Sequence, residues 1–239
     1  MTSRSMLALA GTAGGAGTTR TTVEFGATLA RAGRDVALLD AAFATQGLAA
    51  HVPGRINPDL TALCTGPGEL SDGLVDLAVD VPGRLAACAA RAPFERLARA
   101  KTPEAARRFE SLLDSAARRF DHVLVDTPPV ATNQAVAAVT SADRVALVAP
   151  DSERGLDRLP TMRDRLHDLG APVDAVVATR AVGAVEAADA TIPESDVRTV
   201  ADLPVCADPD TEFAPAVAVA VERVLGTDLE LNFPEEGLL

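Results

Sequence analysis

The residues best suited to chemistry form a glycine-rich stretch near the start of the chain, GTAGGAGTTRTT, from Gly11 to Thr22. It follows a short apolar run, Met6 to Ala10, and precedes a helical pattern. Glycines allow backbone N–H groups to converge on an anion, and the N-terminus of the next helix adds partial positive charge. The stretch therefore predicts a cradle for phosphate. The alternative is a tight turn that holds no ligand.

Two aspartates end apolar runs that have the length of buried strands. Asp40 ends DVALLD, and Asp126 ends DHVLVD, which the rigid turn TPP follows. Ligands of an open parallel sheet lie beyond the carboxyl ends of its strands. Both carboxylates could thus serve a site beside the glycine stretch, or each could be an ordinary strand-end carboxylate that caps the next turn.

The rest of the chain alternates between apolar runs of strand length and helical periodicity. Strands are expected over Met6–Ala10, Asp35–Asp40, Asp121–Asp126, Arg144–Pro150, Val173–Thr179 and Leu203–Ala207. Helices are expected over Thr19–Ala32, Thr102–Arg119, Asn133–Thr140, Leu156–Leu169 and Phe213–Leu225. Arg84 to Ala90 could be a strand or the start of a helix, and residues 41–82 indicate loops with brief helices. This alternation predicts an α/β fold with a doubly wound, mostly parallel sheet flanked by helices in three layers.

The composition indicates a soluble, acidic protein of one main domain. The chain has 239 residues, 48% hydrophobic, with 34 acidic against 22 basic residues and a net charge of -12. Such a charge argues against direct binding to nucleic acid or to an anionic membrane. Lys101 is the only lysine. An acidic, lysine-poor surface is typical of halophilic proteins, and a GC-rich genome that replaces Lys by Arg is the alternative.

Cysteines and histidines give no sign of a metal centre. The three cysteines, Cys64, Cys88 and Cys206, are widely spaced and form no CxxC pair, which predicts reduced thiols in a cytoplasmic protein. The three histidines are isolated in sequence and are expected to be surface or structural residues; they are His51, His122 and His167.

The glycine stretch resembles the phosphate loop of the ParA/MinD group of P-loop ATPases, whose members typically read GKGGxGK[ST]T at this place. Ala13 and Thr18 stand where that family has its two lysines, and Thr19 remains where a hydroxyl would coordinate magnesium. Arg20 lies just inside the helix and is expected to point away from the cradle. The resemblance assigns nucleotide binding to Gly14, Gly15, Ala16, Gly17, Thr18 and Thr19.

Further landmarks extend the resemblance from Met6 to about Leu225. VLVDTPP matches the family's Walker B strand, with Asp126 as the magnesium-associated carboxylate. Asp40 matches the first switch carboxylate and is a candidate catalytic residue, although Ala42 replaces the second one beside it. Arg180, in ATRAVG, stands at a base-contacting turn, and Pro193, in IPES, at a segment that packs on adenine.

The resemblance implies one ParA/MinD-like P-loop domain over residues 1–226 and a peripheral acidic tail over 227–239. The missing lysines and Ala42 predict a weak or inactive ATPase that acts through a protein partner or homodimer in spatial organisation, cell division, chromosome partitioning or regulation. ATP or ADP with magnesium is the ligand expected if the site binds nucleotide at all. One alternative is an active magnesium-dependent ATPase that uses Thr18, Thr19 and Asp126. Another is an iron–sulfur carrier of the same fold, which the cysteine spacing disfavours.

Overall fold

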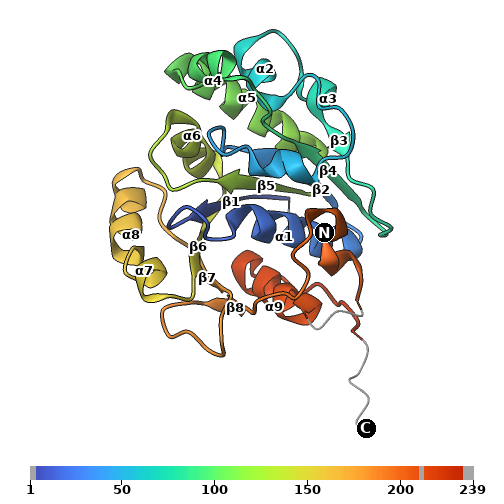
Figure 1. Ribbon diagram of the computed structural model, residues 1–239, viewed down its shortest axis with the longest axis vertical. Helices are drawn as coiled ribbons and strands as arrows, with labels where there is room; N and C mark the ends of the chain where they lie inside the picture. Colours follow the sequence, from blue (N-terminus) through green and yellow to red (C-terminus); the bar gives the residue numbers. More distant parts are fainter. Residues whose placement is uncertain (1–3, 210–212, 234–239) are drawn as a thin grey trace.

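One eight-stranded sheet organises the computed structural model, which describes residues 4–209 and 213–233 (Figure 1). The strand order is β3-β4-β2-β5-β1-β6-β7-β8, and every neighbouring pair is parallel except the short edge pair β3 and β4. The strands are β1 (Ser5–Gly11), β2 (Asp35–Asp40), β3 (Val75–Asp76), β4 (Arg84–Cys88), β5 (His122–Thr127), β6 (Arg144–Pro150), β7 (Ala175–Thr179) and β8 (Ala190–Ile192). The predicted doubly wound α/β class is therefore confirmed.

Helices cover both faces of this sheet, as expected for strands that are apolar along their whole length (Figure 1). They are α1 (Thr18–Arg31), α2 (Leu60–Thr65), α3 (Leu70–Gly73), α4 (Phe94–Ala100), α5 (Pro103–Arg119), α6 (Asn133–Ser141), α7 (Glu153–Leu156), α8 (Leu159–Asp168) and α9 (Phe213–Leu225). Three 3-10 turns add η1 (Gly47–His51), η2 (Val200–Asp202) and η3 (Val205–Ala207). No helix in the described ranges is long and apolar enough to cross a membrane.

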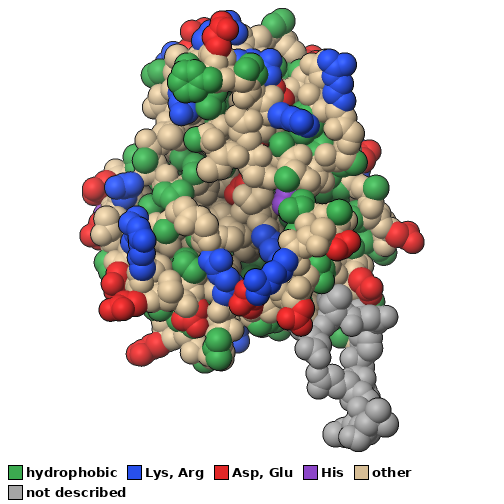
Figure 2. All heavy atoms as spheres, in the orientation of Figure 1, with side chains coloured by type: hydrophobic (Ala, Val, Ile, Leu, Met, Phe, Trp, Pro, Cys, Tyr) green, Lys and Arg blue, Asp and Glu red, His purple; other side chains and the backbone are tan. Residues whose placement is uncertain are grey.

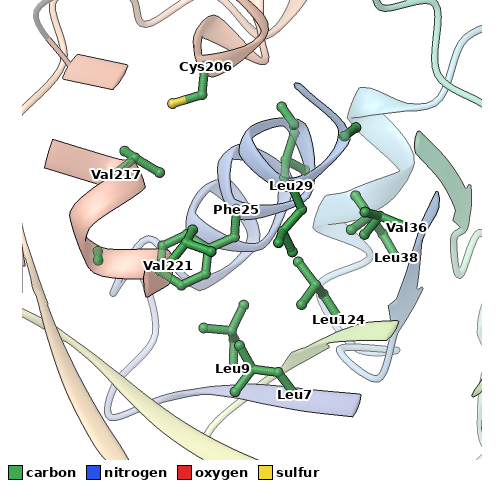
Figure 3. Close-up of a cluster of buried hydrophobic side chains, with 14 of the residues drawn as sticks. Leu7, Leu9, Phe25, Leu29, Val36, Leu38, Leu124, Cys206, Val217 and Val221 are labelled. Atoms are coloured by element: carbon green, nitrogen blue, oxygen red, sulfur yellow. The ribbon is translucent and has the colours of Figure 1, made fainter. Parts of the chain in front are cut away.

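Strand β1 divides the core because its side chains alternate between the two faces. Leu7 and Leu9 join the cluster under α1 and α9, where Phe25 of α1 packs near Val221 of α9 (Figure 3). Ala8 joins the cluster under α6 and α8 on the opposite face. Alanine, valine and leucine make up most of both clusters. This packing fixes α1, and with it the end of the glycine stretch.

The predicted strand over Leu203–Ala207 is wrong. The segment forms the 3-10 turn η3, and its N–H groups do not join the sheet. They donate instead to the buried carboxylate of Glu24 in α1, Val205 over 3.3 Å and Cys206 over 2.9 Å. The sheet edge is taken by β8, a strand that the sequence did not predict.

Of the two alternatives for Arg84–Ala90 the strand is found, as β4. Two other segments differ from expectation. The helix expected over Leu156–Leu169 is divided into α7 and α8. The tail is not peripheral over its described part. Leu229 is buried in the cluster under α1 and α9, and the Arg31 guanidinium lies 4.5 Å from the centre of the Phe233 ring. Residues 234–239 of the predicted tail lie outside the described residues.

Candidate functional site

The glycine stretch forms a loop between the carboxyl end of β1 and the N-terminus of α1. Gly15 and Gly17 have φ angles of 77° and 88°, which residues with a side chain rarely adopt. The Ala16 carbonyl accepts a 2.7 Å hydrogen bond from the Thr179 hydroxyl of β7. Alternating backbone conformations of this kind turn successive N–H groups toward one point. The loop thus has the shape of an anion cradle.

Thr19 and Asp126 meet directly across the start of α1. The Thr19 hydroxyl donates a 2.6 Å hydrogen bond to Asp126 Oδ2 at the end of β5. Magnesium prefers oxygen ligands and is usually held by few protein groups, the remainder being water and phosphate. These two oxygens fit such an ion. The described residues contain no group of three or more His, Cys, Asp or Glu that could hold a metal alone.

Asp40 lies next to Asp126, because the two strand ends are paired in register. Its carboxylate accepts hydrogen bonds from the N–H groups of Ala42, over 2.8 Å, and of Ala90, over 3.3 Å. Burial and the neighbouring Asp126 raise the pKa of Asp40 well above its ordinary value. Burial also raises the pKa of Asp126, to about 6. Asp40 therefore fixes the chain after β2 and β4, and its catalytic role stays a prediction.

A cavity of about 460 Å³ opens beside the loop, and we call it the loop cavity. Figure 2 shows one face of the molecule, with a histidine side chain in the surface and basic side chains, Lys or Arg, below it. The walls of the loop cavity come from the glycine stretch, the segment after β2, the turn after β5 and the segment around η2. Apart from Ala13–Arg20, the lining residues are Ala42, Thr45, Gly47, Ala50, His51, Asp126, Thr127, Pro128, Pro129, Arg198, Val200 and Leu203.

A second cavity of about 180 Å³ lies on the other side of Gly17, and we call it the side cavity. Arg180 and Pro193, which the resemblance assigned to a nucleotide base, both line it. Arg180 has a φ of 54°, and its Nη2 donates a 2.7 Å hydrogen bond to the Gly15 carbonyl. The structure thus brings the predicted loop residues, Arg180 and Pro193 together around one region.

Arg20 lines both cavities, but its guanidinium is held by groups outside the loop. Nη1 donates a 2.7 Å hydrogen bond to the Val197 carbonyl, and the group lies 5.2 Å from the centre of the Phe213 ring. Glu24 is next to it, with 3.6 Å between the Arg20 Nε and Glu24 Oε1. The expectation that Arg20 does not serve the cradle stays a prediction, because its buried Nε and Nη2 have no hydrogen-bond partner among the described residues.

Sequence analysis did not assign Glu24, His51 or Arg198 to the site. A lone acid among the apolar residues of α1 could have marked Glu24 as a buried anchor. His51 comes from η1, where burial and nearby Arg20 lower its pKa. Arg198 belongs to an irregular segment whose path no local pattern predicts. The cysteines do not gather: Cys64 and Cys88 share one core cluster, whereas Cys206 lies in another.

The sheet order, the glycine loop between β1 and α1, and the threonine–aspartate pair together define a P-loop protein of the ParA/MinD type. The sequence matches the family model described as an AAA domain over residues 4–169, which is more than half of the chain. The chain therefore belongs to this family. A search of curated proteins found no match.

Solved structures of ParA and MinD proteins share the fold over nearly the whole chain. MinD from Pyrococcus horikoshii, a septum site-determining protein complexed with Mg-ADP, is 21% identical with a TM-score of 0.77, covering 93% of this chain and 96% of the other. The Chlorobium tepidum ParA family ATPase is 15% identical with a TM-score of 0.74, covering 92% and 99%. The MinC:MinD complex of Aquifex aeolicus matches at 20% identity with a TM-score of 0.73, covering 95% and 98%.

Proposed function

We propose that this protein binds an adenine nucleotide with magnesium, hydrolyses it weakly or not at all, and acts through a protein partner or a second copy of itself. The main support for this proposal is that the site has the backbone shape and the oxygen groups for a nucleotide with magnesium but lacks positive charge at two loop positions. The cradle and the Thr19–Asp126 pair are intact, whereas Ala13 and Thr18 carry no charge. A lysine at such a site neutralises the outer phosphates and stabilises the transition state.

Lys101 cannot restore this charge from its place in the fold. It follows α4 and lines neither the loop cavity nor the side cavity. Its backbone carbonyl accepts a hydrogen bond from Asn133 at the start of α6. Within the described residues the loop therefore has no lysine available, which favours binding without efficient turnover.

The biological role that we propose is spatial organisation or cell division. Support comes from the solved relatives, which include a septum site-determining MinD and a MinD bound to MinC. A switch protein of this kind can bind its partner in a nucleotide-dependent way without rapid turnover. The partner here would read the nucleotide state of the loop cavity.

An active magnesium-dependent ATPase is the second candidate, because the Thr19–Asp126 pair is retained. Calorimetric titration of Mg-ADP and Mg-ATP, followed by a phosphate-release assay, separates the two. We expect measurable binding, loss of binding in Thr19→Ala, and turnover far below about 1 per second, the low end for typical enzymes. Turnover near that rate, abolished by Asp126→Ala, would establish the second candidate instead. Both assays should be repeated at high salt, since the acidic composition is typical of halophilic proteins.

A further inference from the structure

The loop cavity and the side cavity share three lining residues, Gly17, Arg20 and Arg198. Gly17 belongs to the loop itself, and Arg20 is held by the Val197 carbonyl and the Phe213 ring. Arg198 comes from the irregular segment between β8 and η2 and lines both cavities. A ligand that filled both cavities would pass this side chain.

We infer that Arg198 supplies the positive charge for the phosphates of the bound nucleotide, in place of the lysines absent from the loop. This inference rests on the proposed function, since it concerns the same site. A guanidinium is always charged and can donate two parallel hydrogen bonds to a phosphate. Arg198 would therefore act as a binding residue contributed from outside the loop.

The ion pair that Arg198 makes is weak enough for a ligand to replace it. Its Nη2 lies 2.9 Å from Glu194 Oε1, and the two side chains are 77% and 58% exposed. Exposed ion pairs of this kind contribute little free energy because water competes for both charges. A phosphate in the loop cavity would displace Glu194 at small cost.

The other arginines near the loop contact groups inside the fold rather than a surface carboxylate. Arg180 donates to the Gly15 carbonyl and does not line the loop cavity. Burial and nearby Arg20 lower the pKa of His51, which disfavours the charged form of its ring. Among the basic residues that line the loop cavity in the described chain, Arg198 alone has only a surface carboxylate as its partner.

The backbone that carries Arg198 is held in place from both sides. The Val197 N–H donates to the Ser195 hydroxyl over 3.2 Å, and its carbonyl accepts from Arg20 of α1 over 2.7 Å. Ser195 itself is buried. The segment thus positions Arg198 beside α1 without fixing its guanidinium, so that the side chain can turn toward a ligand.

The test is a calorimetric titration of adenosine, ADP and ATP, the nucleotides with magnesium, into the full chain and three variants. Arg198→Ala should weaken ADP and ATP binding about tenfold or more, the effect of one charge-assisted hydrogen bond, and leave adenosine binding unchanged. Arg198→Lys should recover part of the loss. Arg163→Ala, an exposed arginine of α8 outside both cavities, is the matched control and should bind like the unaltered chain.

Glu194→Gln gives an independent test that does not depend on removing the arginine. It releases Arg198 from its partner and should tighten ADP binding about two- to threefold, the size of an exposed ion pair. Unchanged affinity in both Arg198→Ala and Glu194→Gln would overturn the inference while leaving nucleotide binding established. An equal loss for adenosine and ADP in Arg198→Ala would also overturn it. If the unaltered chain bound no nucleotide, the proposed function itself would fail.

Discussion

The two halves of the loop site differ in what they retain. The magnesium half, Thr19 and Asp126, keeps both oxygen groups at hydrogen-bond distance. The charge half, Ala13 and Thr18, carries no ionisable group. The loop between them keeps its shape through glycine conformations and the Thr179 contact. Shape and charge are thus separate properties of this site, and one can be lost without the other.

The largest expected effect comes from restoring the charge half with Thr18→Lys. A lysine at the start of α1 should raise Mg-ADP affinity on the order of 100-fold, since charge-assisted contacts to phosphate are among the strongest hydrogen bonds. Calorimetric titration measures the change. Thr18→Met, which adds length without charge, is the control. Equal affinities of the two variants would show that charge is not the missing property.

The buried Asp126 carboxylate should lower the free energy of unfolding when no metal is bound. Asp126 has a pKa of about 6 in the folded chain and 3.8 as its ordinary value. Folding therefore takes up a proton between these values, and stability falls as pH rises through about 4 to 6. Above that window the buried carboxylate is ionised. Asp126→Asn removes this penalty and should raise the free energy of unfolding at pH 7.5 by on the order of 2 kcal/mol.

Urea unfolding without metal at pH 7.5 and pH 4 measures this effect. The gain in Asp126→Asn should largely disappear at pH 4, whereas the exposed Asp164→Asn should differ little from the unaltered chain at either pH. Added Mg-ADP should stabilise the unaltered chain but not Asp126→Asn. A gain that persisted undiminished at pH 4 would contradict a raised pKa as its cause.

Glu24, which lines the side cavity and holds η3, should have a smaller effect on the free energy of unfolding. The Glu24 carboxylate accepts hydrogen bonds from the N–H groups of Val205 and Cys206. In Glu24→Gln an NH2 group replaces one carboxylate oxygen, so one of these two N–H groups would face another donor. We expect a loss of about 1.5 kcal/mol in unfolding free energy, typical of one lost hydrogen bond to a charged group. Glu110→Gln, on α5, provides a comparison on a partly buried helix face. No difference between the two variants in urea unfolding would mean that η3 is held by packing alone.

Local patterns were sufficient for the central strands and for placing Asp40 and Asp126 at strand ends. The strand ends at Asp40 and Asp126 and the glycine loop follow from apolar runs and their punctuation, and parallel strands must end at the same edge. The prediction of a strand over Leu203–Ala207 was wrong because the hydrogen-bond acceptors of this segment belong to Glu24. Glu24 lies 181 residues earlier in the chain than Val205. The burial of Leu229 and the position of Arg198 at the loop cavity were not predicted, for the same reason. Their environment is set by distant elements, which a reading of nearby residues does not include.

The smallest expected effect tests whether loop shape alone matters. Gly15 has a φ of 77° and open space where a side chain would stand, so Gly15→Ala adds backbone strain without a clash. That strain should cost about 1 kcal/mol in unfolding free energy and should weaken Mg-ADP binding as well. Gly33→Ala, with a φ of 75° and equally open space, should lose similar stability but keep its affinity. If Gly15→Ala bound Mg-ADP as tightly as Gly33→Ala, the conformation of Gly15 would not matter to the ligand, and charge would be the property that sets affinity.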